Sequence, residues 1–327
     1  MPLPSAVAVF AAAKRIRPLL AATPLRHSHG LSEAAGVEVF LKPEHEQRTG
    51  SFKARGALNT LAVMSADERA RGIVAVSAGN HGLGIAYAAR QFRAPATIFV
   101  PSTAPRIKRD GIAALGARVD ATSADYDRAH DAAIAYARQH GRYYVDPCLG
   151  APLIAGQGTV GLEILEELPE TRTIVVSVGG GGLAAGVGSI VRRAAPDIRI
   201  IGVQGDRTQA AARALEAGRV VDVPVVPTLA DGLTGQIDVE AFENVREVVD
   251  RIVIVSEEEI AAAIAWMYRE SEGVAEGAGA VGVAAVLGGR LGRVEGPVVV
   301  IVSGGNIDPD VHERVLREGG VRAAGSS

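Results

Sequence analysis

Short runs of β-branched and other apolar residues alternate with longer amphipathic segments along most of the chain. Strand-like runs separated by helix-length segments are typical of βαβ units and a parallel sheet. The same alternation is present in both halves, and neither a sequence repeat nor a low-complexity linker interrupts it. The predicted strands cover residues 37–42, 73–76, 96–100, 118–120, 143–145, 174–178, 198–203, 252–255 and 298–302.

Polar residues at the start of several amphipathic segments mark helix N-termini. Ser5 can cap a first short helix, and Ser123 can cap a helix that runs to about residue 140. Ser256 and Glu259 have the spacing of a capping box, which predicts a helix directly after the strand at 252–255. Other predicted helices end near residues 64, 91 and 116, cover about 153–167, or begin near 183.

This order of elements predicts an α/β protein with two open, twisted lobes and mostly parallel sheets. We expect residues 49–147 to form the smaller lobe, inserted into a larger lobe made of residues 1–48 and 148–327. Ligands of such sheets bind outside the carboxyl ends of the strands. The predicted site therefore lies in the cleft between the lobes, on the loops that follow the strands.

One lysine stands out at the start of a predicted helix, in the stretch Thr49-Gly50-Ser51-Phe52-Lys53. Lysine is rare in this chain: 4 of its 34 basic residues are lysine and the others are arginine. An arginine does not lose its proton in a protein, whereas a lysine whose pKa is lowered by burial can form an imine. Lys53 is thus a candidate nucleophile, and from this stretch alone an ordinary surface cation fits equally well.

Four consecutive glycines, Gly179 to Gly182, lie between a predicted buried strand and a helix. Backbone N–H groups at a helix N-terminus, free of side chains, form a cradle for phosphate. Gly179, Gly181 and Ala184 also fit the dinucleotide pattern G-x-G-x-x-A, but the acidic residue expected at the end of the next strand is replaced by Gln204. A phosphate site is therefore favoured over a dinucleotide site, and no P-loop motif is present.

Two further loops end predicted strands. The loop at 77–82 offers Ser77, Asn80, His81 and free N–H groups, which could hold a carboxylate, although a simple turn with a capping asparagine explains it equally well. The loop at 303–306 places Ser303 where a hydroxyl could hydrogen-bond a ring nitrogen without protonating it. Taken alone, this second loop is weak evidence for a site.

Composition and charge narrow the classes of function. A net charge of -3 gives no reason to expect a nucleic-acid or membrane partner. The single Cys148 excludes an intrachain disulfide and fits a reducing compartment, and no metal-ligand spacing occurs. The apolar run at 7–13 has its positive charges after it, which is the wrong order for a signal peptide. We therefore expect a cytoplasmic protein without a metal.

The motifs in their order along the chain resemble the fold type II pyridoxal-phosphate enzymes, and in particular the threonine/serine dehydratase and serine racemase branch. The resemblance implies the two-domain fold of the tryptophan synthase β type, pyridoxal 5'-phosphate as cofactor and an amino acid as substrate. The larger lobe would be the domain that binds the cofactor. The motifs lie at residues 51–56, 77–82, 179–182 and 303–306, with shorter similar stretches at 23–25, 154–159, 230–232 and 276–280.

The resemblance also implies a role for each matching position. Lys53 would form a Schiff base with the cofactor aldehyde and then act as the base at the substrate Cα. Phe52 would pack on the cofactor ring, Asn80 would bond its hydroxyl oxygen and Ser303 its pyridine nitrogen. The implied cofactor-binding residues are Phe52, Lys53, Asn80, Gly179, Gly180, Gly181, Gly182, Glu276 and Ser303, and the implied substrate-binding residues are Ser77, Ala78, Gly79, Asn80 and His81.

The reaction implied is α,β-elimination of water and ammonia from a β-hydroxy amino acid, with L-threonine and L-serine as the leading substrates. Two positions depart from the branch. Ala78 stands where racemases of the branch carry a serine, which disfavours racemisation, and Gln204 replaces an acidic residue of the metal-binding members. The chain also ends soon after the 303–306 loop, so we expect no C-terminal regulatory domain and no allosteric inhibition by amino acids.

Other functions stay open from the sequence. The same elimination could act on 3-hydroxyaspartate or another hydroxylated amino acid. The cofactor could instead serve racemisation or β-replacement. A different class, a nicotinamide-dependent oxidoreductase or a non-catalytic nucleotide-binding module, would lack a visible absorption band that borohydride abolishes. A homodimer is expected on the resemblance alone.

Overall fold

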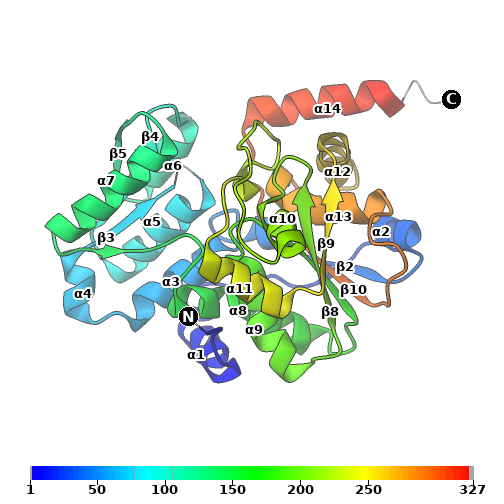
Figure 1. Ribbon diagram of the computed structural model, residues 1–327, viewed down its shortest axis with the longest axis horizontal. Coiled ribbons are helices and arrows are strands. Elements are labelled where there is room, and N and C mark those ends of the chain that lie inside the picture. The colour runs from blue at the N-terminus through cyan, green and yellow to red at the C-terminus, as the bar shows by residue number, and fades with distance from the viewer. Residues whose placement is uncertain (1, 78, 105, 324–327) are drawn as a thin grey trace.

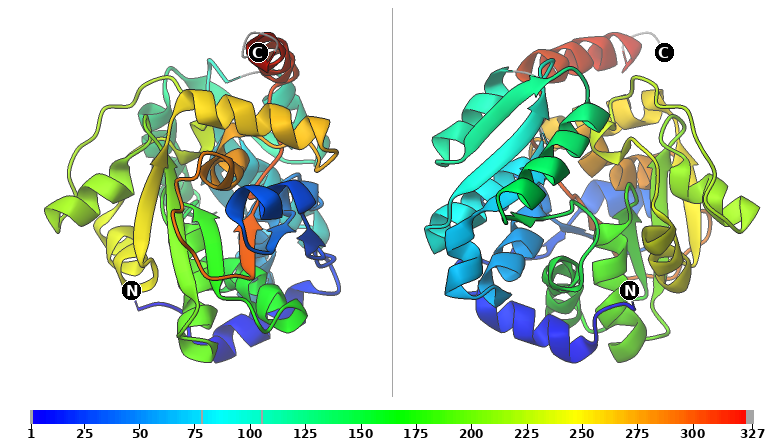
Figure 2. Two further views of the ribbon diagram at one scale, coloured as in Figure 1. Left: turned by 90° about the vertical axis from the view of Figure 1, so that its right-hand side faces the viewer. Right: turned by 60° about the vertical axis from the view of Figure 1, so that its left-hand side comes forward.

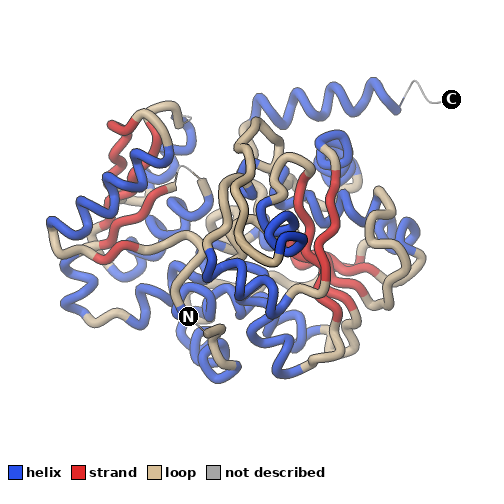
Figure 3. The backbone as a smooth tube through the Cα atoms, viewed as in Figure 1, coloured by secondary structure: helices blue, strands red, loops and turns tan. Residues whose placement is uncertain are grey.

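The computed structural model describes residues 2–77, 79–104 and 106–323, and it contains two separate sheets with helices on their faces. Figure 1 shows the two sheets side by side, and Figure 3 shows their strands as two separate groups. The larger sheet has six strands. Their order is β1 (Arg26–His27), β2 (Val39–Lys42), β10 (Val298–Ile301), β7 (Thr173–Ser177), β8 (Arg199–Gly205) and β9 (Arg251–Val255).

Five of these six strands run parallel, and only the short edge strand β1 is antiparallel to its neighbour β2. The smaller sheet has four strands, all parallel. The prediction of mostly parallel α/β sheets is therefore confirmed. The order in the smaller sheet is β5 (Arg118–Ser123), β4 (Ala96–Pro101), β3 (Ile73–Val76) and β6 (Tyr143–Tyr144).

Helices connect the strands and cover both sheets. Figure 2 shows α1 along the bottom of the molecule and α14 across its top. The α-helices are α1 (Ala6–Ile16), α2 (His29–Ala35), α3 (Lys53–Val63), α4 (Ala66–Arg71), α5 (Asn80–Phe92), α6 (Arg106–Ala114), α7 (Tyr126–Gln139), α8 (Ala151–Glu167), α9 (Gly182–Ala194), α10 (Ala210–Ala217), α11 (Val239–Val248), α12 (Glu257–Arg269), α13 (Gly277–Leu287) and α14 (Pro309–Ala323). Two 3-10 helices, η1 (Glu44–Glu46) and η2 (Asp231–Leu233), complete the described elements.

Successive side chains of a central strand enter different cores, as the strand period of two requires. In β7, Ile174 and Val176 pack with residues of α8, α9 and α11, whereas Val175 packs with residues of α12 and α13. In β3, Ile73 and Ala75 belong to the core shared with α3 and α5. The alternate residues, Val74 and Val76, pack with residues of α7. Both sheets are thus covered on two faces, which explains why central strands such as β3 and β10 are apolar throughout.

Most predicted element boundaries agree with the structure to within a few residues, and one predicted cap is wrong. Ser5 caps α1 and Ser256 forms the capping box of α12, as predicted. Ser123, however, is the last residue of β5, where it continues the ladder opposite Pro101. The side chain of Asp125 caps α7 instead, by accepting a hydrogen bond of 2.8 Å from the backbone N–H of Arg128.

The two sheets draw on different parts of the chain. The smaller sheet is formed entirely within residues 73–144, and the strands of the larger sheet lie at 26–42 and 173–301. Domain boundaries at 48/49 and 147/148 stay a prediction. Within the described ranges, no helix combines the length and apolarity needed to cross a membrane.

Candidate active site

Lys53 is the first residue of α3, and the loop before it joins the two lobes. Ser51 forms an antiparallel bridge with Gly304, and the N–H of Phe52 donates to the carbonyl of Ser303 at 3.1 Å. The loop that carries the lysine is thereby fixed to the carboxyl end of β10. The Lys53 Nζ lies 5.2 Å from the centre of the Phe52 ring and donates to the Pro147 carbonyl at 2.8 Å.

The glycine run at the N-terminus of α9 has no room for side chains. A Cβ on Gly180 would lie 2.4 Å from Cys148 Sγ, and one on Gly182 would lie 2.9 Å from the Cys148 carbonyl oxygen. Gly181 has φ of 83°, a left-handed conformation that favours glycine. The first turn of a helix has N–H groups without intrahelical partners and a positive dipole end. This segment fits an anionic phosphate group.

Ser303 lies at the carboxyl end of β10, one strand from the glycine loop. The residue is 4% exposed, and its hydroxyl accepts from Ser177 Oγ at 3.2 Å and donates a long hydrogen bond of 3.3 Å to the Ala278 carbonyl. A hydroxyl in this place can donate to a ring nitrogen but stays neutral itself. A contact of this neutral hydroxyl with a ring nitrogen stays a prediction.

The predicted substrate loop lies at the N-terminus of α5. Ser77 Oγ accepts from the N–H of Gly79 at 3.0 Å, and Asn80 is the first residue of the helix. Ala78 lies outside the described residues. His81 is buried, and its Nε2 is 3.1 Å from the Val145 carbonyl, which can only accept a hydrogen bond.

The neutral state of His81 follows from its surroundings. Burial, together with the nearby Lys53 charge, lowers the pKa of the imidazole to about 3. Nε2 carries the proton that is donated to Val145, and Nδ1 is buried without a hydrogen-bond partner among the described residues. His81 therefore brings no positive charge to a substrate carboxylate. The helix N-terminus and the Ser77 hydroxyl are the groups that can favour an anion here.

Asn80 belongs to a line of hydrogen bonds that we name the Asn80 chain: the Thr49 carbonyl, Asn306, Asn80 and Glu276. Asn306 Nδ2 donates to the Thr49 oxygen at 2.8 Å and to Asn80 Oδ1 at 2.6 Å. Asn80 Nδ2 donates to Glu276 Oε1, also at 2.6 Å. Burial, with a further contribution from the negative charge of Asp231, raises the pKa of Glu276 to about 7.

A second polar group, which we name the Arg55 cluster, is buried behind the lysine helix. It consists of Arg55, Glu44, Glu163 and Lys42, two cations and two carboxylates. Arg55 contacts both oxygens of each glutamate at 2.7–2.8 Å, and Nη1 also reaches Thr159 Oγ1 at 3.1 Å. The cluster joins β2, η1, α3 and α8. Since its members are buried and paired with one another, the cluster ties the lysine helix α3 to β2 and α8.

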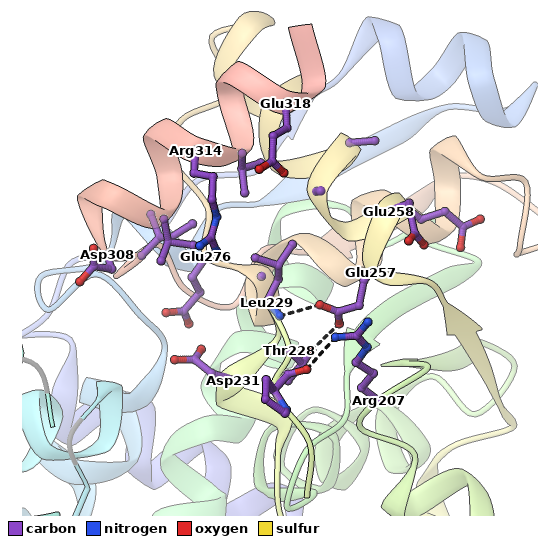
Figure 4. A pocket seen from close by; sticks show the side chains of 18 of the residues that line it. Arg207, Thr228, Leu229, Asp231, Glu257, Glu258, Glu276, Asp308, Arg314 and Glu318 are labelled. Atoms are coloured by element: carbon purple, nitrogen blue, oxygen red, sulfur yellow. Dashed lines mark hydrogen bonds between the residues drawn. The ribbon is translucent and has the colours of Figure 1, made fainter. Parts of the chain in front are cut away.

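A cavity of about 1160 Å³ opens beside Glu276, between α12, α14 and the loop before η2. Figure 4 shows the Glu276 and Asp231 carboxylates directed toward the same space. Glu257 fixes the loop, because it accepts hydrogen bonds from Thr228 Oγ1 and from the Leu229 N–H. Across the opening, the Nζ of Lys108, a residue of α6, lies 3.2 Å from Asp231 Oδ2.

Gln204 has a structural role. Its Nε2 donates to the Val178 carbonyl and its Oε1 accepts from the Ala212 N–H, both at 2.8 Å, and the side chain is fully buried. The amide therefore bridges the end of β7 to α10. Across the part of the chain that the structure describes, no group of three or more His, Cys, Asp or Glu residues could hold a metal ion.

The comparisons with known proteins agree with this geometry. The family described as pyridoxal-phosphate dependent enzyme matches residues 16–304. An L-threonine ammonia-lyase from Thermotoga maritima is 45% identical over 92% of this chain and 75% of its own length. The solved structure of a T.th. threonine deaminase superimposes with a TM-score of 0.88 at 36% identity and covers 93% of this chain and 99% of its own. Maize serine racemase gives a TM-score of 0.90 at 29% identity, over 99% of this chain and 100% of its own.

A lysine at one helix N-terminus and a glycine-lined second helix N-terminus, in a fold of two α/β sheets, fit a pyridoxal-phosphate enzyme. This chain belongs to the pyridoxal-phosphate-dependent enzyme family, so the predicted fold type and cofactor are confirmed. The role of each site residue stays a prediction. The sequence predicted no role for Asn306, Lys108 or Pro147. Asn306 is the last residue of the 303–306 motif. No motif contains Lys108 or Pro147, because only folding brings these two residues to the site.

Proposed function

We propose that the chain removes water and ammonia from a β-hydroxy amino acid, with L-threonine or L-serine as the leading substrates, to give a 2-oxo acid. The observation that carries this proposal is that the loop before Lys53 is bonded to the loop of Ser303, a neutral residue. The contacts are the bridge between Ser51 and Gly304 and the hydrogen bond from the Phe52 N–H to the Ser303 carbonyl. Relatives named L-threonine ammonia-lyase at 45% and 41% identity support it.

Bound pyridoxal phosphate supplies an electron sink for the carbon that loses its proton. The chain's own residues bind and orient that group. Gly179–Gly182 and the N-terminus of α9 would hold the phosphate, and Phe52 would pack on the ring. Ser303 would offer its hydroxyl to the ring nitrogen, which leaves that nitrogen uncharged.

Lys53 is the residue that would move the proton. As a free amine it accepts the proton from the substrate Cα, and the Pro147 carbonyl, 2.8 Å from Nζ, gives the amine a fixed resting partner. Positioned proton transfer of this kind contributes about 10²–10⁴-fold to a rate. His81 is neutral at pH 7, because its pKa is lowered to about 3, so it does not serve as the acid for the leaving hydroxyl.

The first experiment measures 2-oxo acid release from cofactor-loaded protein. The panel holds L-threonine, L-serine, D-serine, both 3-hydroxyaspartate diastereomers, and O-acetylserine with sulfide. Release from L-threonine or L-serine supports the proposal. Release only from another hydroxylated amino acid keeps the elimination and changes the substrate, whereas no release from any member contradicts it.

Lys53→Ala is the sharpest test of the residue assignment. We expect turnover to fall by at least about 10²–10⁴-fold, because the base is removed. Borohydride treatment should no longer fix the cofactor to the chain, as read by mass spectrometry. The exposed Lys14→Ala variant is the matched control and should keep both properties. Normal turnover in Lys53→Ala would reject Lys53 as the base.

Racemisation is the second candidate, because maize serine racemase shares the fold at a TM-score of 0.90. Chiral analysis of the amino acid recovered from the L-serine reaction separates racemisation from elimination.

The proposal also includes a homodimer in the cytoplasm. The single cysteine supports the reducing compartment. Analytical ultracentrifugation of the purified protein tests the homodimer, and a monomer at micromolar concentration would contradict it.

A further inference from the structure

The contacts of the Asn80 chain fix which end of the Asn80 amide faces the cofactor site. An asparagine amide has a donor end and an acceptor end that look alike, so its orientation must follow from its partners. The chain begins at the Thr49 carbonyl, which can only accept. Asn306 must therefore turn its Nδ2 toward Thr49, and the two atoms lie 2.8 Å apart.

The orientation of Asn306 then determines that of Asn80. The second N–H of Asn306 Nδ2 points at Asn80, at 2.6 Å, so the atom of Asn80 that receives it must be Oδ1. The Nδ2 end of Asn80 is left for other acceptors. One of its two N–H groups reaches Glu276 Oε1 at 2.6 Å. Among the described residues, no further contact engages the other N–H.

Two glycines show that these contacts are built into the backbone. A Cβ on Gly50 would lie 2.4 Å from Asn306 Oδ1, and Gly50 has φ of 72°. A Cβ on Gly304 would lie 2.4 Å from Glu276 Oε1 and 3.0 Å from Asn80 Nδ2. The N–H of Gly305 also donates to the Gly50 carbonyl at 2.9 Å, which keeps Asn306 beside the lysine loop.

We propose that Asn306 is a positioning residue that locks the Asn80 amide so that it offers an N–H, rather than its carbonyl, to the ring oxygen of the cofactor. The inference rests on the proposed contact between Asn80 and that oxygen. An N–H donor stabilises the ionised form of the ring oxygen, whereas a carbonyl would require the oxygen to keep its proton. Asn306 therefore sets the protonation state of the bound cofactor without touching it.

Asn306→Asp tests the lock because a carboxylate cannot donate to either partner. Asn80 must then turn its Nδ2 toward the new carboxylate and present Oδ1 to the site. We expect cofactor affinity to fall by about tenfold to a hundredfold, the value of one hydrogen bond to a charged group. The absorption of the lysine-bound cofactor should shift from the visible band toward the shorter-wavelength form with a protonated ring oxygen.

Asn306→Ala repeats the test without a new charge, in case the aspartate variant does not fold. It removes the lock but not the donor end of Asn80, so the shift should have the same direction and a smaller size. Asn59→Ala is the matched control: Asn59 is a buried asparagine that donates to the Pro152 carbonyl at 2.7 Å. Its spectrum should equal that of the unmodified protein, and an equal shift in this control would overturn the inference.

Asn80→Ala separates the two levels of the argument. If this variant keeps the cofactor affinity and the spectrum of the unmodified protein, the proposed contact of Asn80 is wrong and the inference falls with it. If it changes both and neither Asn306 variant does, the contact stands and the lock is overturned. Shifts in the same direction in the Asn80 and Asn306 variants support the lock.

Discussion

Two polar networks lie close to the same lysine and have opposite properties. The Arg55 cluster is dry and balanced: Arg55, Glu44 and Lys42 are each no more than 1% exposed, and every N–H of the guanidinium has an acceptor. The Asn80 chain lies at the cavity, with a carboxyl whose pKa is raised to about 7. The first network is complete within the protein, whereas in the second one N–H of Asn80 has no acceptor among the residues that the structure describes.

The difference shows how a buried glutamate behaves in two different surroundings. Opposite charges in contact, with all hydrogen bonds made, fix a single arrangement and leave nothing for a ligand. A buried carboxyl whose hydrogen-bond partner is an amide instead of a cation can change its protonation state near neutral pH. The three predictions that follow test this contrast.

Arg55→Ala should have the largest effect on stability. It leaves the Glu44 and Glu163 charges buried with Lys42 as their main remaining partner, and breaking a buried ion pair costs about 3–5 kcal/mol. The measurement is the urea dependence of circular dichroism. Arg17→Ala is the control. Arg17 pairs with Glu166 on the exposed side of α8, the helix that also carries Glu163, so its removal should lower the free energy of unfolding by less than about 1 kcal/mol. Equal losses in both variants would contradict the contrast.

Glu276→Gln should change the pH dependence of stability. The pKa of Glu276 is about 7 in the folded protein against 4.5 for an ordinary glutamate, because burial disfavours the charge. The folded state thus holds the proton more tightly, and its free energy of unfolding decreases as the pH rises from about 4.5 through about 7. The loss is on the order of 3 kcal/mol.

The glutamine variant should lack this decrease and be the more stable protein at pH 8. The measurement is the urea midpoint of cofactor-free protein at a series of pH values. Glu247→Gln, at an exposed glutamate of α11, is the control and should leave the curve unchanged. A curve for Glu276→Gln that still falls through pH 7 would show that another group is responsible.

Lys108→Ala should have the smallest effect on stability. The ion pair with Asp231 spans the two lobes, but its side chains are 23% and 61% exposed. Such a pair contributes roughly 0–1 kcal/mol and is screened by salt. We expect a small drop in the urea midpoint at low salt that disappears at high salt. A loss as large as that of Arg55→Ala would mean that the rim of the cleft is as rigid as the buried cluster.

Most of the fold could be predicted because the chain repeats one local pattern. Strand β3 begins and ends as predicted, and Ser5 and Ser256 cap the helices that they were expected to cap. The errors fall where local signals compete. Ser123 has the chemistry of a cap, but the pairing of β5 with β4 extends the strand through it. The short edge strand β1 and the almost uniformly apolar α13 offer no clear periodicity.

For the site, the sequence supplied the parts and not their contacts. Lys53, the glycine run and Ser303 could be named because each belongs to a motif at a strand end. Nothing local distinguishes Asn306 as a partner of Asn80, since 226 residues separate them. His81 was expected beside a charged substrate, and only its burial against Val145 shows that it is neutral.

By itself the sequence determined the class of fold and predicted the lysine and the glycine cradle, because periodicity and glycine runs act over a few neighbouring residues. The tertiary structure alone decided which polar groups meet, which are dry and which carry a shifted pKa. Protonation states and amide orientations depend on burial and on partners that approach through space. For this reason the Glu44 and Glu163 carboxylates of the Arg55 cluster and the Glu276 carboxyl of the Asn80 chain are the same residue type in the sequence and have different surroundings in the folded protein.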